Sequence, residues 1–220
     1  MGFKSIVIIV TIAVYGINAQ NPCSLDDFDC IREHFAANSQ CDPLTAFPHI
    51  PDSFSAANLR FKAPYFNLSH IDQSVTITGL ENCAISVLLA NESSRVTKLT
   101  FDCPNLHVEA ARAFIIHNVD NPDERHYYMR VAADYESVQL SQSIRNSNNL
   151  NICQGEATAF TSLPTILAQG YDRPSIAFIS RDDLGNFGPD LDVWSRECWA
   201  ARATSVFRFL VNNRICDFNC

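Results

Sequence analysis

The sequence predicts an α+β protein in which a curved antiparallel sheet wraps around a long C-terminal helix, with a short N-terminal helix and several disulfide bonds. Three observations support this prediction. Extended, β-rich segments fill most of residues 54–140, and a long helical pattern then runs from Asp190 to about Asn213. Nine cysteines accompany them. One face of the helical pattern is broadly apolar, and only a large concave surface, such as a curved sheet, would cover it.

The N-terminal segment has the pattern of a signal peptide. Lys4 supplies a positive charge, and the apolar run 6–15 is shorter than the roughly 20 residues that cross a bilayer. Ala19 suits the specificity of signal peptidase, so we expect cleavage between Ala19 and Gln20. Residues 20–220 would then form a single secreted globular domain. They contain no apolar stretch of spanning length, so we expect no membrane contact.

Composition limits the classes of partner. About 200 residues with 47% hydrophobic content suffice for one full-sized core. The formal net charge is −8, or −9 once Lys4 is removed, and the basic residues are scattered. Because binding to nucleic acid or anionic lipid needs a concentrated positive surface, we expect neither partner.

The first helix and its disulfide are predicted from residues 23–38. Ser24-Leu25-Asp26-Asp27 resembles a capping box, and Asn38 suits the end of the helix. Cys23 stands just before this helix and Cys30 in its second turn, so a local Cys23–Cys30 bridge is sterically reasonable. The apolar residues on one helix face are Phe28, Ile31 and Phe35.

The strands are expected at 58–66, 75–90, 96–103, 107–116 and 127–140. Residues 75–103 are interpreted as a hairpin around Asn91-Glu92-Ser93-Ser94. A register in which facing residue numbers sum to 186 puts Ile85 opposite Phe101 and gathers the apolar residues on one face, including Val87 opposite Leu99 and Leu89 opposite Thr97. The same register sets Cys83 opposite Cys103 and predicts a second bridge.

The remaining cysteines leave an odd thiol. Cys153 and Cys198 would close a long loop, for which the chain-entropy model gives about 4 kcal/mol of stabilisation. Cys41, Cys216 and Cys220 then remain, and three cysteines cannot all pair with one another. One of them is expected to be either a buried thiol or a link to another chain.

The C-terminal helical stretch supplies the core of the predicted wrap. Trp194 and Cys198 form one stripe, with a second stripe beside it made by Trp199, Ala203, Val206 and Leu210. The aromatic side chains of this region are interpreted as core residues, although the arrangement could leave a tunnel between helix and sheet; they are Trp194, Trp199, Phe207 and Phe209.

Two N-glycosylation sites are predicted, at Asn67 and Asn91, each followed by a serine at the second position. Asn91 lies at the expected hairpin tip, where a glycan would leave the core undisturbed. A third sequon, Asn151-Ile152-Cys153, has the rare cysteine form, and we do not expect its use if Cys153 is bridged.

The sequence contains no pattern of catalytic chemistry. The nucleophile-elbow, phosphate-loop and dinucleotide-binding patterns are all absent. No cysteine pair has the close spacing of a zinc site, and the six histidines stand singly. We therefore predict a protein without enzyme activity, metal or cofactor, whose function is binding.

Residues 21–41 resemble fibrohexamerin, the small glycoprotein of lepidopteran silk fibroin. The similarity is carried by Asn21-Pro22-Cys23, Asp29-Cys30-Ile31-Arg32 and Phe35-Ala36-Ala37-Asn38-Ser39-Gln40-Cys41. It implies a silk-gland protein that associates non-covalently with the disulfide-linked heavy and light fibroin chains. In that family the role is to keep the assembly soluble and competent for secretion. Exposed apolar patches would be the structural sign of such a role.

A more distant resemblance, to the takeout and juvenile-hormone-binding proteins of insects, implies an alternative. It rests on the Cys23 and Cys30 pair, on residues 75–80, and on the separation of Cys153 from Cys198. The implied fold is again a helix wrapped by a curved sheet. The implied function is transport of a small hydrophobic ligand in a closed cavity of roughly 300 to 1,000 Å³.

Overall fold

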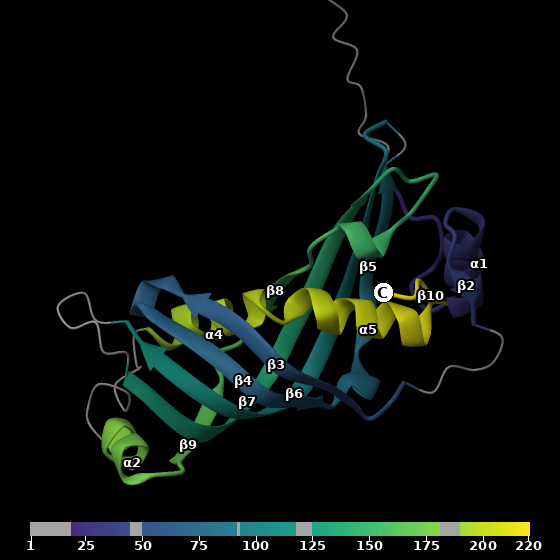
Figure 1. Ribbon diagram of the computed structural model, residues 1–220. Coiled ribbons are helices and arrows are strands. Elements are labelled where there is room, and N and C mark those ends of the chain that lie inside the picture. The colour runs from purple at the N-terminus through teal and green to yellow at the C-terminus, as the bar shows by residue number, and fades with distance from the viewer. Residues whose placement is uncertain (1–18, 45–49, 92, 118–124, 181–189) are drawn as a thin grey trace, which may run out of the picture.

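The computed structural model describes residues 19–44, 50–91, 93–117, 125–180 and 190–220. All of the expected signal peptide except Ala19 therefore lies outside the described residues. The described chain forms a strongly curved antiparallel sheet, with helices lying across its concave face (Figure 1). This arrangement confirms the predicted fold class.

Two strands of 21 residues each, β6 (Val96–Ile116) and β7 (Arg125–Arg145), form the centre of the sheet. One side of β6 pairs first with β5 (Ala84–Asn91) and then with β4 (Leu68–Thr78), which continues to β3 (Ser53–Ala63). The free side of β7 pairs with β8 (Thr158–Thr161) and β9 (Thr165–Gly170). A two-residue strand, β1 (Ala19–Gln20), adds to β5. The sheet remains open, with β3 at one edge and β8 and β9 at the other.

The structure merges two predicted strands into one. Segments 96–103 and 107–116 belong to the continuous β6, and the break predicted between them is an irregularity at Asn105, which has a left-handed backbone with φ of 52°. Pro104 and Leu106 on either side of it both pair with β7. An asparagine tolerates this conformation better than most residues, so the chain bends there without ending the strand.

The hairpin register is correct near Cys83 and wrong beyond Ile85. Ile85 faces Phe101 as predicted, but a bulge after Ile85 shifts the register so that Leu88 faces Leu99. Because neighbouring side chains of a strand point to opposite faces, one extra residue exchanges the buried and exposed sets. Leu88 is therefore 1% exposed and Leu89 39% exposed, whereas Val87 and Leu89 were expected in the core.

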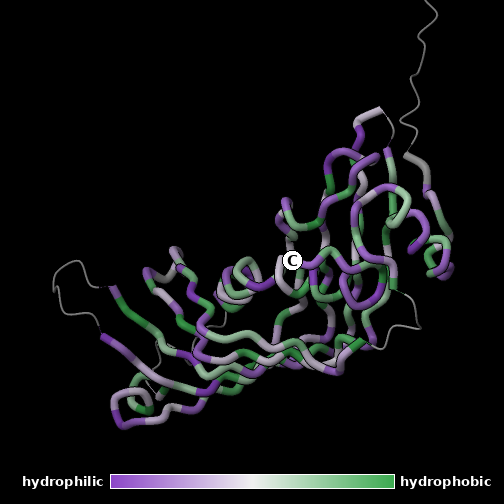
Figure 2. Tube along the Cα trace, turned by 45° about the vertical axis from the view of Figure 1, so that its right-hand side comes forward, coloured by the Kyte–Doolittle hydropathy of each residue, from purple (hydrophilic) through white to green (hydrophobic). Residues whose placement is uncertain are grey.

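The other strand boundaries also differ from the expected ones. The predicted strand 75–90 divides into β4 and β5 at Gly79, whose φ is +90°, followed by the short 3-10 helix η2 (Leu80–Asn82). The strand expected at 58–66 starts earlier and ends at η1 (Pro64–Phe66), which begins with a proline. Strands β8 and β9 were not predicted. Figure 2 shows hydrophobic and hydrophilic residues interleaved along the sheet.

The N-terminal helix α1 (Phe28–Ala37) forms as predicted. The Asp27 carboxylate accepts a hydrogen bond from the Cys30 N–H and caps the first turn. Asn38 ends the helix, with its N–H donating to the Phe35 carbonyl. Ile31 and Phe35 are completely buried.

The predicted C-terminal helix is two helices, α4 (Leu191–Ala200) and α5 (Ala203–Arg214), separated by a turn at Ala201 and Arg202. A shorter helix, α2 (Arg173–Ser180), follows β9. Helix α4 contacts both β3 and β8, which belong to opposite edges of the sheet. The sheet therefore curls far enough to enclose α4 from both sides (Figure 1).

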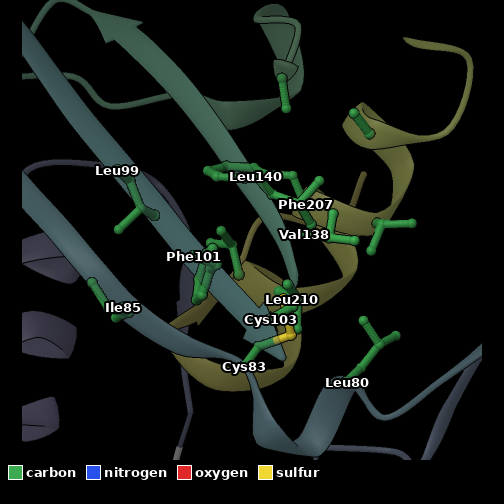
Figure 3. Close-up of a cluster of buried hydrophobic side chains, with 14 of the residues drawn as sticks. Leu80, Cys83, Ile85, Leu99, Phe101, Cys103, Val138, Leu140, Phe207 and Leu210 are labelled. Atoms are coloured by element: carbon green, nitrogen blue, oxygen red, sulfur yellow. A yellow bond between two sulfur atoms is a disulfide. The ribbon is translucent and has the colours of Figure 1, made fainter. Parts of the chain in front are cut away.

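The concave face holds two apolar clusters. Under α5, Phe207 and Leu210 are fully buried against strand residues such as Phe101 and Leu140, next to the Cys83–Cys103 bridge (Figure 3). Under α4, Trp194 packs in a second cluster that includes Phe114, Met129 and Val131. Trp194, Trp199 and Phe207 are core residues as predicted, and Phe209 is partly buried, with its ring 5.5 Å from that of Phe54.

Four disulfides form within the chain. The structure joins Cys23 to Cys30 and Cys83 to Cys103, as predicted. The predicted Cys153–Cys198 bridge is wrong, because Cys153 is bonded to Cys220 and Cys198 is a free, buried thiol. Cys153 lies in η3 (Ile152–Gln154), where its sulfur contacts the Phe218 carbonyl near the C-terminus, whereas Cys198 faces the sheet from α4. Loop length alone carried no information about this placement.

The fourth bridge, Cys41–Cys216, joins the two termini. It lies beside a small two-stranded sheet of β2 (Asp42–Pro43) and β10 (Cys216–Asp217). Three of the four bridges therefore gather at the end of the molecule that holds α1, β2 and β10, and β9 and α2 lie at the other end (Figure 1).

Candidate functional site

Two features of the described residues depart from an ordinary core and surface. The first is a group of charged side chains buried between the sheet and the helices. Asp72 of β4, Arg112 of β6 and Arg202 of the α4–α5 turn are 0%, 1% and 3% exposed. Arg112 donates to both carboxylate oxygens of Asp72, at 2.5 and 3.0 Å, and Arg202 donates to Oδ2 at 2.5 Å. Burial would raise the pKa of Asp72, but Arg112 and then Arg202 hold it below its usual value.

Aromatic rings and the free thiol enclose this buried charge group. The Arg112 guanidinium lies 5.3 Å from the centroid of the Phe61 ring and 5.4 Å from that of Trp194. Its Nη1 lies 3.4 Å from the Cys198 sulfur. The single carboxylate of Asp72 faces the guanidinium groups of both Arg112 and Arg202. The Cys198 thiol and the aromatic rings therefore supply the other favourable contacts of Arg112.

His70 completes the buried charge group as a neutral ring. It is 0% exposed, stacks on Phe61 and meets the edge of Phe114, with centroid distances of 4.8 and 4.5 Å. Neither ring nitrogen has a hydrogen-bond partner. Burial, and then the positive charge of Arg112, lower the pKa of His70 to about 3. The whole group is sealed from solvent, so we interpret it as a link between the sheet and the α4–α5 turn.

The second feature is an exposed apolar surface at the sheet edge formed by β8, β9 and α2. We call it the apolar edge surface, and its members are between 52% and 72% exposed; they are Phe160, Leu163, Leu167, Tyr171 and Ile176. All five fall within 17 consecutive residues, and the stretch 157–171 contains no charged residue. Apolar side chains so concentrated and so exposed usually mark a site where a partner binds.

An open groove adjoins the apolar edge surface. Its volume is about 730 Å³, and it lies on the sheet face that points away from α4 and α5. Phe160 forms one wall, and Pro104 and the hydrogen-bonded pair of Gln139 and Asp102 line the rest. The groove extends the area that a partner could cover beyond the edge itself.

Charged residues of β7 opposite β9 are already paired with β6. Arg130 donates to both oxygens of Glu109, at 2.7 and 2.8 Å, and Asp134 lies 2.6 Å from the His107 ring. The hydrogen bond to Asp134, aided by Glu109, raises the pKa of His107, although burial opposes the rise. These pairs engage the charges of the β7 segment that pairs with β9.

The predicted glycosylation sites lie away from the apolar edge surface. Asn67 is exposed between η1 and β4, and its Nδ2 donates to the His117 carbonyl at 2.7 Å. Asn91 is half-buried at the end of β5, and its side-chain oxygen accepts from the Ser94 N–H at 2.9 Å. Both positions are separated from β9 by the two central strands. In the third sequon, Cys153 is bridged.

The described residues contain no group of three or more His, Cys, Asp or Glu side chains close enough to hold a metal ion. Within the same ranges, no helix is both long and apolar enough to cross a membrane.

Fold and surface together define a disulfide-bonded α+β protein with a sealed interior and an exposed apolar edge. The chain belongs to the Fibroin P25 family, whose model matches residues 19–220. It is 34% identical over 205 residues to Fibrohexamerin of Galleria mellonella, covering 92% of this chain and 90% of that protein. The resemblance to fibrohexamerin predicted from residues 21–41 is thereby confirmed.

A solved structure, Takeout 1 of Epiphyas postvittana, is also similar to this chain. The sequence identity is 11%, the TM-score is 0.42, and the match covers 87% of this chain and 93% of the other.

Sequence reasoning missed both features of the site. Asp72, Arg112 and Arg202 are 40 and 90 residues apart along the chain, and no spacing indicates that they meet. The apolar edge surface did leave a signal, the absence of charge from 157 to 171. That stretch was not assigned to any strand.

Proposed function

We propose that this protein is a secreted, non-catalytic glycoprotein of the silk fibroin assembly. It binds the disulfide-linked heavy and light fibroin chains without a covalent bond and helps to keep them soluble and competent for secretion. The observation that carries this proposal is the apolar edge surface, found on a member of the Fibroin P25 family. Four disulfides within the chain fit an oxidising, extracellular compartment.

The state of the cysteines supports a non-covalent association. All nine cysteines lie within the described ranges, and eight of them are paired within the chain. The ninth, Cys198, is 1% exposed and lies against Arg112. No thiol of the folded chain therefore reaches the surface to form a bridge to fibroin.

The positions of the predicted glycans also suit this role. Sugars at Asn67 and Asn91 would project from strands on the far side of β6 and β7. They would add a hydrophilic surface to the assembly and leave β8, β9 and α2 accessible to the partner.

The carrier alternative for a small hydrophobic ligand gains no specific support. Helix α5 fills its part of the concave face with side chains that are 0% exposed, including Val206, Phe207 and Leu210. The groove beside Phe160 is open and lies on the other face of the sheet. We keep this alternative as an outcome of the test below.

Co-secretion with fibroin tests the proposal. A tagged chain is expressed with fibroin heavy and light chains in secreting cells and is recovered from the medium without reductant. We expect all three chains to be recovered together. A chain that is secreted alone and carries extracted lipid would contradict the proposal and favour the carrier.

A matched pair of variants tests the surface. Phe160→Ser combined with Leu163→Ser removes two exposed apolar groups, and we expect recovery of fibroin to fall by about tenfold. Leu89→Ser, which changes an exposed leucine on β5, serves as the control and should leave recovery unchanged. Equal loss in both variants would show that the binding surface lies elsewhere.

A further inference from the structure

We propose that β9 binds fibroin by accepting an additional strand, an inference that rests on the proposed function. The residues Thr165–Gln169 of β9 would pair through their backbone with an extended, uncharged segment of the fibroin partner, and Leu167 would pack against its side chains. This mode of recognition supplies backbone hydrogen bonds as well as apolar contact.

The hydrogen-bond pattern of β9 leaves one side of its backbone available. The Tyr171 N–H donates to the Tyr128 carbonyl at 2.9 Å, and the ladder continues from there in unbroken register. Because the backbone groups of successive strand residues point to opposite sides, the N–H and C=O of Leu167 face β7. Those of Ile166 and Ala168 point away from it, and among the described residues no strand pairs with that side.

Two other strands at the sheet edges, β3 and β8, are protected. Edge strands attract further strands unless charges, irregularities or covering elements prevent it. The edge strand β3 carries the exposed cations Arg60 and Lys62 and is interrupted at Asn58, whose backbone is left-handed with φ of 56°. Strand β8 is contacted by α4, with the Thr161 hydroxyl 3.0 Å from that of Ser195.

Within the part of the chain that the structure describes, strand β9 shows none of these protections between Thr165 and Gln169. Leu167 is 72% exposed, and no charged residue occurs from 157 to 171. Helix α2 packs closely on the end of β9, where a Cβ atom on Gly170 would lie 2.6 Å from the Ile176 nitrogen. The available edge is therefore about five residues long, enough for a short added strand.

Charge decides between the possible occupants. The chain carries a formal net charge of −8, so a second copy would be repelled at long range. The edge itself is uncharged from Thr165 to Gln169, and the charges opposite it on β7, Arg130 and Asp134, are paired with Glu109 and His107. An apolar strand without acidic groups would suit such an edge, and we assign this added strand to the fibroin partner.

Two variants of the edge test this inference. Ala168→Pro removes an N–H that points away from β7, so it blocks an added strand without removing a bond from the β7–β9 ladder. Leu167→Lys adds the kind of charge that protects β3. The control, Leu89→Lys, makes the same change at an exposed leucine of β5.

Binding is measured on immobilised fibroin heavy–light assembly from which this protein has been stripped with mild detergent. We expect Ala168→Pro and Leu167→Lys each to raise the Kd by at least about tenfold, and Leu89→Lys to change it by less than about twofold. Thermal unfolding of each free variant establishes that it is folded. Amide exchange of the bound wild-type chain gives a second readout, in which Ile166 and Ala168 gain protection and Leu167, already bonded to β7, gains little.

The outcomes separate this inference from the proposed function. Suppose that the wild type and both edge variants bind equally well, and that Ile166 and Ala168 gain no protection on binding. This result overturns the added strand and leaves the association with fibroin intact. A wild-type chain that does not bind the assembly overturns both. If the free wild-type chain forms a dimer and Ala168→Pro abolishes that dimer, the edge binds a second copy of the chain instead of fibroin.

Discussion

At the scale of single residues, the buried charge group explains the path of the C-terminal segment. Arg202 lies in the turn between α4 and α5, and from there it donates to Asp72 of the sheet. Asp72 in turn holds Arg112, which contacts Cys198. Buried charges of this kind are costly unless every partner is present, so the group specifies one arrangement of helix on sheet.

The free thiol gives a direct test of the disulfide pattern. Cys198 is 1% exposed, so we expect no alkylation of the native chain and one alkylated thiol per chain after unfolding without reductant. Peptide mapping should place the label on Cys198. Labelling of Cys220, or of the native chain, would contradict the pairing of Cys153 with Cys220.

His70 makes stability depend on pH. Its pKa is about 3 in the folded chain, and 6.5 is its ordinary value, so the unfolded chain binds more protons between these two pH values. The free energy of unfolding should therefore fall as the pH drops below 6.5, by about 1.4 kcal/mol per pH unit from this group alone.

Urea unfolding of the wild type and of His70→Leu, at about pH 7, 6 and 5, measures this contribution. The variant should show a shallower decrease. His107, whose pKa is raised, acts in the opposite direction: its stabilisation is present below 6.5 and is lost as the pH rises through its folded pKa. Identical slopes in both proteins would show that His70 does not carry the effect.

At the scale of elements, irregular residues decide where strands begin, bend and end. Gly79 separates β4 from β5, Asn105 bends β6, and the bulge after Ile85 selects which face of β5 is buried. Each is a local departure from regular geometry that the hydrophobic pattern alone does not reveal.

Gly79→Ala should be strongly destabilising. The φ of +90° is costly for a residue with a side chain, and the added Cβ would lie 2.8 Å from the Asn105 carbonyl oxygen. We expect the free energy of unfolding to fall by more than about 2 kcal/mol. Asn82→Ala, an exposed change in the same connection, should cost less than about 0.5 kcal/mol. Chemical denaturation of the two variants gives the comparison, and equal costs would argue against strain at Gly79.

The parts that could be predicted from sequence are those with local or periodic signals. The apolar face of α1 and the Cys83–Cys103 pairing follow from spacing along a few residues, although the cap of α1 is Asp27 and the capping-box pattern predicts a start at Ser24. The Cys153–Cys220 bridge and the meeting of Asp72 with Arg202 depend on how the whole sheet curls, so no local pattern contains them. The edge strand β9 was missed because it shows no apolar–polar alternation: the exposed Leu167 stands between the partly buried Ile166 and Ala168.

At the scale of the whole molecule, three of the four disulfides are separated from the apolar edge surface. The apolar edge surface lies on β8, β9 and α2, and three disulfides lie at the opposite end with α1 and β10. The proposed association with fibroin through uncharged groups should therefore depend little on ionic strength and not at all on thiol exchange.

Salt and detergent distinguish this mode of association from an electrostatic one. In about 1 M salt, where the Debye length is about 3 Å, we expect the recovered assembly to stay intact. Mild detergent without reductant should release this protein, because it competes for the apolar edge surface. Release by salt alone, or only by reductant, would contradict the proposed contact.

The Cys41–Cys216 bridge, described above as a link between the termini, has a mechanical consequence. Together with Cys153–Cys220 it ties the C-terminus to the first fifth of the chain and to η3. A force applied to β9 is resisted only by hydrogen bonds and packing, because no disulfide lies between Thr158 and Ser180. Under load we therefore expect β9 to separate from the sheet before the disulfide-bonded end opens.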